Sequence, residues 1–519
     1  MHLTSGRNIV IISTMFQVEQ NINGTTYVYQ VTAYWDSAKK QARQKRVCIG
    51  KKDPRTGELL PSKGQMRPRG CRDYGNFHLL HSIAIELELT DALKEQFPDT
   101  WQEILTCAFY EISERKPLYL CEQWSESTET IDGITLTSQR ISELLQELGK
   151  SDRERQAFFK SWARHRAEQE YLAFDITSVS SYSKLIEFLE YGYNRDGEDL
   201  PQINLAMLFG ETSHLPIFYS TSQGSIRDMS TLSNMILQAE YLEMKKIRFV
   251  MDKGFYSDAN VAEMLKKRVK FAVSVPFTTL LAKRLVEKSR KSICSPGKSF
   301  MLNGDIIYYE KYPLHSHNSR LSAFVYYDER HFLDSKEALL KRIMLLEQKL
   351  SGKSAIPRAM RDPCMKYLVT RHSKNGLLLH RNDQAIHDAL LYRGYVVILS
   401  NDMRDPYDML CVYRAKDAVE RAFDNMKNEL DLKRLRVHSE TAMTGRTFLC
   451  FIALILYSWL DKKMKESDLY KRFTQEEVMA QLKRLKIVEL DERRKMLTEI
   501  SKNQIYLFEH LDIARPEPA

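Results

Sequence analysis

The sequence has few of the residues that mark disulfide-rich, fibrous or membrane-spanning proteins. Cysteine occurs only eight times in 519 residues and never as C-x2-C, so neither a disulfide scaffold nor a zinc ribbon is indicated. The 20 glycines and 15 prolines are too few for a collagen-like or low-complexity chain. The longest apolar run, Phe448–Leu460, is too short to span a bilayer. We therefore expect a cytoplasmic globular protein with reduced, mostly buried thiols.

Several motifs that define common enzyme classes are also missing from the sequence. No G-x4-G-K-[ST] segment occurs, so no nucleotide cofactor is indicated. Serine and cysteine nucleophile motifs are absent, and His315 and His317 lack a third zinc ligand in a recognisable frame. The first residues lack the order of a secretory signal. These absences argue against an ATPase, a serine or cysteine hydrolase, a zinc enzyme and a secreted protein.

The basic residues are concentrated near the N-terminus. The formal net charge is only +9, but residues 1–75 hold thirteen Lys or Arg against five Asp or Glu. A local positive field of this kind attracts phosphate groups. A solvated terminus without a ligand would have the same composition, so charge alone leaves both interpretations open.

Hydrophobic periodicity divides the chain into six segments around an α/β core. Strand-like alternation dominates the first segment, helical spacing the second, and strands with intervening helices the third. The segments are a basic β-rich N-terminal segment (1–75), a helical domain (76–170), the first part of the core (171–276), an inserted β-rich subdomain (277–393), the second part of the core (394–461) and a C-terminal helical region (462–519).

The core segments predict a mixed sheet flanked by helices. Three strands with hairpin-like spacing come first, and two strands that each follow a helix come next, an order typical of a meander followed by βαβ units. A further strand and a helix resume the core after the insertion, and the long apolar run forms a buried helix. The expected strands are 171–176, 203–209, 216–220, 247–251, 271–275 and 394–399.

Two aspartates stand at the ends of predicted core strands. Asp175 lies in YLAFDI and Asp252 follows IRFVM. If these strands are neighbours, both carboxylates emerge at one sheet edge, where they repel each other unless a cation lies between them. Oxygen ligands of this kind suit Mg²⁺ or Mn²⁺. Taken singly, each Asp could instead be an ordinary turn or helix-cap residue.

A predicted helix from Tyr413 to about Leu430 carries a third acidic residue. At 100° per residue, Tyr413, Lys416, Glu420 and Lys427 fall on one narrow stripe beside an apolar face that would seat the helix on the sheet. The alternative is a solvated helix face with an ordinary Lys416–Glu420 pair.

Together, these residues resemble the insertion-sequence transposases of the DDE type, in the bacterial group with the signature Y-x2-R-x3-E-x6-K. Tyr413, Glu420 and Lys427 match this signature in type and spacing, whereas Lys416 stands where the group usually has Arg and lacks its bidentate fork. The resemblance also covers Asp175–Thr177, Gly192–Phe209 and Asp252–Ser257.

The resemblance implies a ribonuclease-H-like core with a β-rich insertion and a mostly helical N-terminal DNA-binding region. It implies that Asp175, Asp252 and Glu420 are the catalytic residues and hold two Mg²⁺ ions, for which Mn²⁺ can substitute. Tyr413, Lys416 and Lys427 would contact DNA. The implied partner is double-stranded DNA, both the transposon ends and the target. The resemblance also implies a homodimer in the bacterial cytoplasm, which is located at the nucleoid when it is bound to DNA and has no membrane partner.

Other interpretations remain open at this point. A metal-dependent nuclease of the same fold, or an inactive DNA-binding relative, would share most of these features, and Tyr413 could in principle be a nucleophile. Some relatives stack a flipped base on a Trp of the inserted region. All five Trp of this chain lie outside that region: Trp35, Trp101, Trp124, Trp162 and Trp459.

Overall fold

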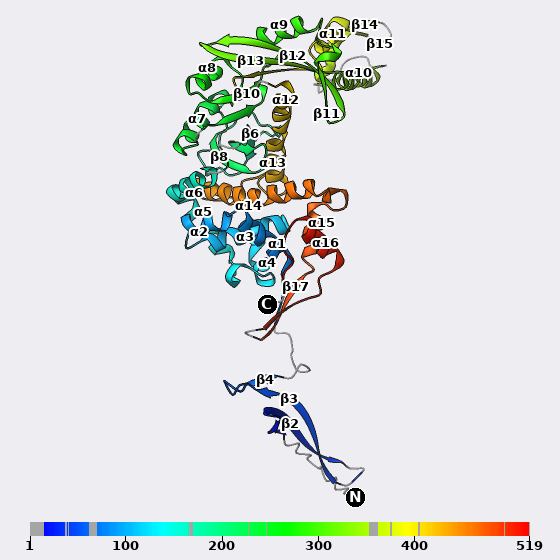
Figure 1. Ribbon diagram of the computed structural model, residues 1–519. Coiled ribbons are helices and arrows are strands. Elements are labelled where there is room, and N and C mark those ends of the chain that lie inside the picture. Colours follow the sequence, from blue (N-terminus) through cyan, green and yellow to red (C-terminus); the bar gives the residue numbers. More distant parts are fainter. Residues whose placement is uncertain are drawn as a thin grey trace.

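The computed structural model consists of a large sheet with helices around it and a small sheet that stands apart near the N-terminus (Figure 1). Predictions for residues 1–14 and 62–69 of the basic segment lie outside the described residues. The structure describes residues 15–36, 39, 41–61, 70–164, 166, 170–226, 228–244, 246–351, 362–373, 376–402, 405–491 and 494–517.

The alternating pattern of residues 25–50 predicts a small sheet, and the structure contains one, with antiparallel strands. Among the described residues its strands follow chain order. The first two strands are joined through Asn23 and Gly24, which have φ angles of 50° and 80°. Asn-Gly tolerates these positive angles, which the tightest hairpin turn requires. The strands are β1 (Met15–Ile22), β2 (Thr25–Asp36), β3 (Gln41–Lys52) and β4 (Leu59–Pro61).

The central sheet confirms the predicted mixed α/β core. In the part of the chain that the structure describes, its order is β11-β12-β13-β16-β10-β9-β6-β7-β8. The first three core strands form an antiparallel meander, and β9 and β10 run parallel to β6 after helical crossovers. The core elements are β6 (Leu172–Ser180), β7 (Gln202–Gly210), β8 (Pro216–Gln223), α7 (Asp228–Tyr241), β9 (Arg248–Met251), α8 (Asp258–Lys266), β10 (Lys270–Ser274) and β16 (Tyr395–Ser400).

The segment 277–393 contributes to two different hydrophobic cores. Its first strands extend the central sheet, because β13 pairs with β16. Its second half forms a small cluster around Ile343, Leu346 and Tyr367. The elements are α9 (Leu280–Ser289), β11 (Ser299–Leu302), β12 (Asp305–Ser316), β13 (Ser319–Asp328), α10 (Glu329–Leu350), β14 (Leu368–Ser373), β15 (Gly376–Arg381) and α11 (Asp383–Leu390).

Helix α14 (Glu440–Glu466) lies between the central sheet and the N-terminal helices (Figure 1). It is long and apolar enough to cross a membrane, but 94% of its most apolar stretch is buried inside the protein, which confirms the predicted buried helix. Phe448 packs against Phe97 and Phe158. The surrounding helices are α1 (Gly75–Glu86), α2 (Leu89–Gln96), α3 (Trp101–Glu114), α4 (Cys121–Ser127), α5 (Ser138–Lys150) and α6 (Asp152–Arg164).

The C-terminal region contains a hairpin that the prediction of a helical segment missed. Strand β17 (Lys486–Asp491) pairs with β18 (Arg494–Leu497) and with β5 (Gly70–Asp73), which is distant in the sequence. Helices α15 (Gln475–Leu482) and α16 (Lys502–His510) flank this hairpin. All eight cysteines lie among the described residues and are free, as expected, but only Cys107, Cys121 and Cys450 are buried, so "mostly buried" was wrong.

Candidate active site

Asp175 and Asp252 emerge side by side from two neighbouring parallel strands. In the register of β6 and β9, Phe174 lies opposite Met251, and each aspartate is the next residue. Strand β9 ends there because Asp252 begins the short helix η3 (Lys253–Phe255). The predicted adjacency of the two strands is therefore confirmed.

Glu420 reaches the same place from a helix packed on the sheet. Helix α13 (Asp417–Asn428) contacts β6 and β7 and buries an apolar stripe that includes Val419, Ala422 and Phe423. The single helix expected from Tyr413 to about Leu430 was wrong, because the chain forms two helices that meet at Lys416. Around this junction the amide of Lys416 donates to the carbonyl of Tyr413, which is a tighter turn than that of an α-helix. The preceding helix is α12 (Pro406–Ala415).

The three carboxylates line one pocket of about 390 Å³. Their elements converge there because α13 packs on β6 and β9 ends beside Asp175. The prediction that Asp175 stands at the end of its strand was wrong, because β6 continues to Ser180. The pocket combines several acidic side chains with two basic ones. Its lining residues are Asp175, Ile176, Thr177, Arg195, Asp196, Asp252, Gly254, Phe255, Glu420, Phe423, Asp424 and Lys427.

The carboxyl group of Asp175 is strongly affected by its surroundings. Burial removes water from this carboxylate and raises its pKa to about 6, and the nearby charge of Glu420 acts in the same direction. The backbone amide of Ile176 and the positive charge of Arg195 partly offset this rise. A carboxylate held in such a site favours a neighbouring cation.

Tyr413 and Lys416 contact the other two acids. The Tyr413 hydroxyl donates to Asp252 Oδ1 at 3.1 Å, and Lys416 Nζ lies 3.1 Å from Glu420 Oε1. Burial, together with the charge of Asp252, raises the pKa of Tyr413 well above its usual range, so the phenol stays neutral. Burial alone would lower the pKa of Lys416, but Tyr413, Asp252 and Glu420 more than offset it, so Lys416 stays charged.

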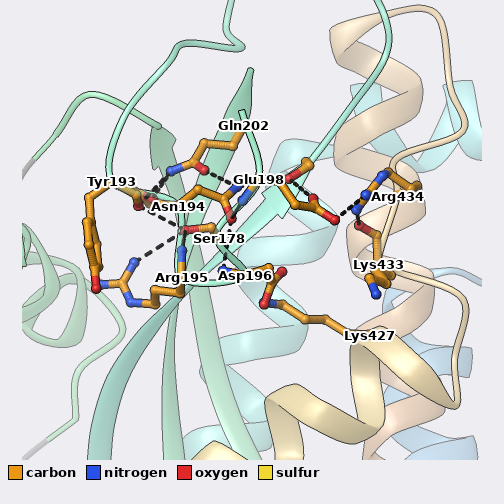
Figure 2. Close-up of polar contacts among 12 residues, drawn as sticks. Ser178, Tyr193, Asn194, Arg195, Asp196, Glu198, Gln202, Lys427, Lys433 and Arg434 are labelled. Carbon is orange, nitrogen blue, oxygen red and sulfur yellow. Dashed lines mark hydrogen bonds and ion pairs between the residues drawn. The ribbon is translucent and has the colours of Figure 1, made fainter. Parts of the chain in front are cut away.

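Lys427 points to an acidic residue that the sequence analysis did not single out. Its side chain is 8% exposed, and its Nζ lies 2.8 and 2.9 Å from the two carboxylate oxygens of Asp196 (Figure 2). Asp196 and Arg195 belong to the loop between β6 and β7 and both line the pocket. The signal was the polar run Asn-Arg-Asp-Gly-Glu-Asp at 194–199, set between two buried strands.

Buried polar groups fasten this loop to the sheet. The Asn194 amide donates to Ser180 Oγ at 3.0 Å, and its Oδ1 accepts the backbone N–H of Asp196 at 2.9 Å. The Gln202 amide donates to the carbonyl of Tyr193 at 3.0 Å. Figure 2 shows these contacts converging on the loop from both strands. Arg195 and Asp196 are thus presented to the pocket by a hydrogen-bonded support.

The donor set suits a divalent metal, although it is not arranged as a complete site. No group of three or more His, Cys, Asp or Glu within the described residues is placed to hold a metal ion as it stands. The reason is visible in the contacts: Asp252 accepts the Tyr413 hydroxyl, and the 57% exposed Glu420 side chain pairs with Lys416. Carboxylate oxygens from three elements, facing one pocket, fit Mg²⁺ or Mn²⁺ by chemistry.

The fold and the site define an α/β protein with a carboxylate-based candidate active site on a mixed sheet. The family described as Transposase DDE domain matches residues 166–456, which is more than half of the chain. The chain belongs to this family, which confirms the resemblance to transposases of the DDE type.

Other comparisons add little to this assignment. None of the curated proteins compared matches the chain. Among solved structures, the piggyBac transposase synaptic complex with hairpin DNA is similar at 11% identity and a TM-score of 0.33, over 79% of this chain and 70% of that chain.

Proposed function

We propose that this protein is a DNA transposase that binds the terminal inverted repeats of an insertion sequence, cleaves at the ends and joins the 3′-OH to target DNA. One observation carries the proposal: Asp175, Asp252 and Glu420, from three separate elements, line a single pocket in a chain of the DDE family. Phosphodiester chemistry needs charge neutralised on the entering and leaving oxygens, and clustered carboxylates provide the ligands for that.

In this proposal Asp175, Asp252 and Glu420 hold two Mg²⁺ or Mn²⁺ ions. When bound, the ions neutralise charge on the reacting phosphate and lower the pKa of the attacking hydroxyl or water. Glu420 must exchange its contact with Lys416 for this role, and its exposure leaves the side chain room to turn. Asp175, which is half-buried and has a raised pKa, is stabilised in its charged form by a neighbouring cation.

Tyr413, Lys416 and Lys427 contact the DNA backbone in this proposal. In the structure each of them contacts a carboxylate: Tyr413 contacts Asp252, Lys416 contacts Glu420, and Lys427 contacts Asp196. Phosphate oxygens can take the place of these carboxylates as acceptors, since both are anionic oxygen groups. The neutral phenol of Tyr413 supports a role as hydrogen-bond donor rather than as nucleophile.

We further propose that the protein acts as a homodimer on paired duplex ends, because two ends must be cut and joined together. The basic residues near the N-terminus and the helices α1–α6 would bind the ends. Phosphate contacts position the duplex, whereas base contacts specify the sequence.

The test is an assay of cleavage and strand transfer on DNA that carries the inverted repeats flanking the reading frame. With Mg²⁺ the protein should nick the ends and produce joined molecules. Asp175→Asn, Asp252→Asn and Glu420→Gln should each lower both products about a hundredfold or more. Asp408→Asn, an exposed carboxylate on α12, is the matched control and should change neither.

Three results would overturn the proposal. If Asp252→Asn still cuts DNA, the pocket is not the site of cleavage. Cutting without any joined product would indicate a nuclease. Absence of metal-dependent cutting in the unmodified protein, with DNA binding retained, would indicate an inactive relative.

A further inference from the structure

A second and larger cavity, of about 850 Å³, lies beside the active-site pocket and shares Lys427 with it. Its walls are residues 182–185, which follow β6, together with residues 427, 428, 431 and 433–438, which lie at and after the end of α13. The two walls are tied together by backbone contacts: the amide of Leu435 donates to the carbonyl of Ser180 at 3.1 Å, and Ser181 Oγ donates to the carbonyl of Leu435 at 3.1 Å. We call this cavity the basic groove.

The charge of the basic groove is predominantly positive. Lys184, Lys433 and Arg436 are exposed in it, and Arg434 is half-buried. The acidic lining residue, Asp431, lies 3.3 Å from Arg436. Within the described part of the chain Lys184 and Lys433 form no ion pair, so their ammonium groups face the groove or solvent. Lys184 and Lys433, unlike Arg434 and Arg436, are not paired with an acid in the described part of the chain, and such cations attract a phosphodiester chain.

The basic groove also exposes an aromatic ring and an apolar side chain. Tyr182 is 71% exposed and Leu185 is 74% exposed. The Arg434 guanidinium lies 5.5 Å from the centre of the Tyr182 ring, while it also pairs with Glu198 (Figure 2). These contacts hold Arg434 against one side of the ring, and the ring's exposure leaves contact area for a ligand.

Cations beside an exposed aromatic ring are the combination with which proteins bind single-stranded nucleic acid. Bases stack on the ring and phosphates meet the cations. In a paired duplex both faces of an internal base are already stacked, so the ring has no partner there. The ligand that uses both features is therefore an unpaired strand.

We propose that the basic groove binds an unpaired stretch of DNA next to the site of cleavage, with a base stacked on Tyr182 and phosphates at Lys184 and Lys433. The proposal rests on the proposed function for its partner, DNA, and adds a feature of that partner, a locally opened strand. Lys427, which lines both cavities, places the groove in continuity with the active-site pocket.

The test compares the binding of two probes by fluorescence anisotropy in EDTA, where cutting does not occur. One is a blunt duplex of arbitrary sequence, and the other is the same duplex with a short unpaired thymidine extension. The unmodified protein should bind the extended probe about fivefold or more tightly, the lower end of what one stacked base contributes. Tyr182→Ala should abolish this preference, and Tyr182→Trp should retain it.

Two further variants keep the test specific. Tyr241→Ala removes a tyrosine that is equally exposed, at 70%, on the distant helix α7, and should keep the preference. The double change Lys184→Gln and Lys433→Gln should weaken binding of the extended probe more than binding of the blunt one. It should also reduce the salt dependence of binding to the extended probe.

The proposal is overturned if Tyr182→Ala keeps its preference for the extended probe. It is also overturned if Tyr241→Ala loses this preference to the same extent as Tyr182→Ala. Equal binding of both probes by the unmodified protein would also overturn it and leave the groove as a duplex surface. Mg²⁺-dependent cutting, assayed separately, tells failure of this inference from failure of the proposed function, because the three carboxylates are untouched.

Discussion

Replacing Asp175 by Asn should stabilise the metal-free protein while it abolishes activity. Burial raises the pKa of this carboxyl from 3.8 to about 6. Each pKa unit corresponds to about 1.36 kcal/mol, so ionising Asp175 costs the metal-free fold about 3 kcal/mol. Asn has nearly the same shape, carries no charge and can still accept the backbone N–H of Ile176. A gain in the free energy of unfolding is expected when the replaced residue serves the reaction at the expense of stability.

The sign of the pH dependence follows from the direction of the pKa change. Because the pKa is raised in the folded state, the contribution of Asp175 to stability is fully present below about pH 4. It is lost as the pH rises towards and beyond 6. Asn does not titrate. The two proteins should therefore be about equally stable at pH 4 and differ by about 3 kcal/mol at pH 8.

Urea unfolding followed by circular dichroism, in EDTA at both pH values, measures this difference. Asp175→Asn should have the higher midpoint at pH 8, and added Mg²⁺ should narrow the gap by stabilising only the unmodified protein. Asp408→Asn, on the surface of α12, should show no such pH dependence. Equal midpoints at pH 8, or a lower midpoint for Asp175→Asn, would show that ionised Asp175 does not destabilise the metal-free protein.

Three further predictions concern the surroundings of the site and the core. Asp196→Asn leaves the buried Lys427 ammonium without its carboxylate and should lower the free energy of unfolding by about 1–3 kcal/mol in urea titrations; no change would show that the pair is not structural. Tyr413→Phe should retain Mg²⁺-dependent cutting at about a tenth of the rate, whereas complete loss with a covalent DNA adduct in the unmodified protein would make Tyr413 a nucleophile. Gly445→Ala places a Cβ 2.0 Å from the carbonyl oxygen of Leu145, so it should cost about 1–3 kcal/mol in thermal or urea unfolding, while an unchanged midpoint would mean that α5 and α14 can separate freely.

The central sheet was readable from the sequence because its strands are short apolar runs separated by helix-period segments. The buried helix near 447–461 was equally clear. What sequence patterns do not reveal is pairing between distant segments: β17 has no strong strand signal of its own and is completed by β5. The break at Lys416 was also hidden, because residues 413–430 keep a helical pattern on both sides of the junction.

The three acidic residues were identified because two of them follow short apolar runs and the third belongs to a motif of characteristic spacing, although Asp175 lies within β6 and not at its end. The loop that supplies Arg195 and Asp196 was not assigned a role. Its residues are held at the pocket by hydrogen bonds that include those to Ser180 and Gln202, and these contacts depend on the register of β6 and β7 rather than on any local pattern. The role of a single side chain on a loop can be recognised only when the positions of the strands on either side of the loop are known.

The position of α14 restricts how the molecule can take up a bulky ligand. Aromatic contacts join it to α6 and to β8 at once, since Phe451 touches both Phe159 and Tyr219. Separating the helical layer from the sheet would expose the apolar side chains of α14 to water, which would cost a large amount of hydrophobic free energy. A bulky ligand, such as the duplex DNA proposed above, must therefore bind to the outer surfaces of these layers rather than between them.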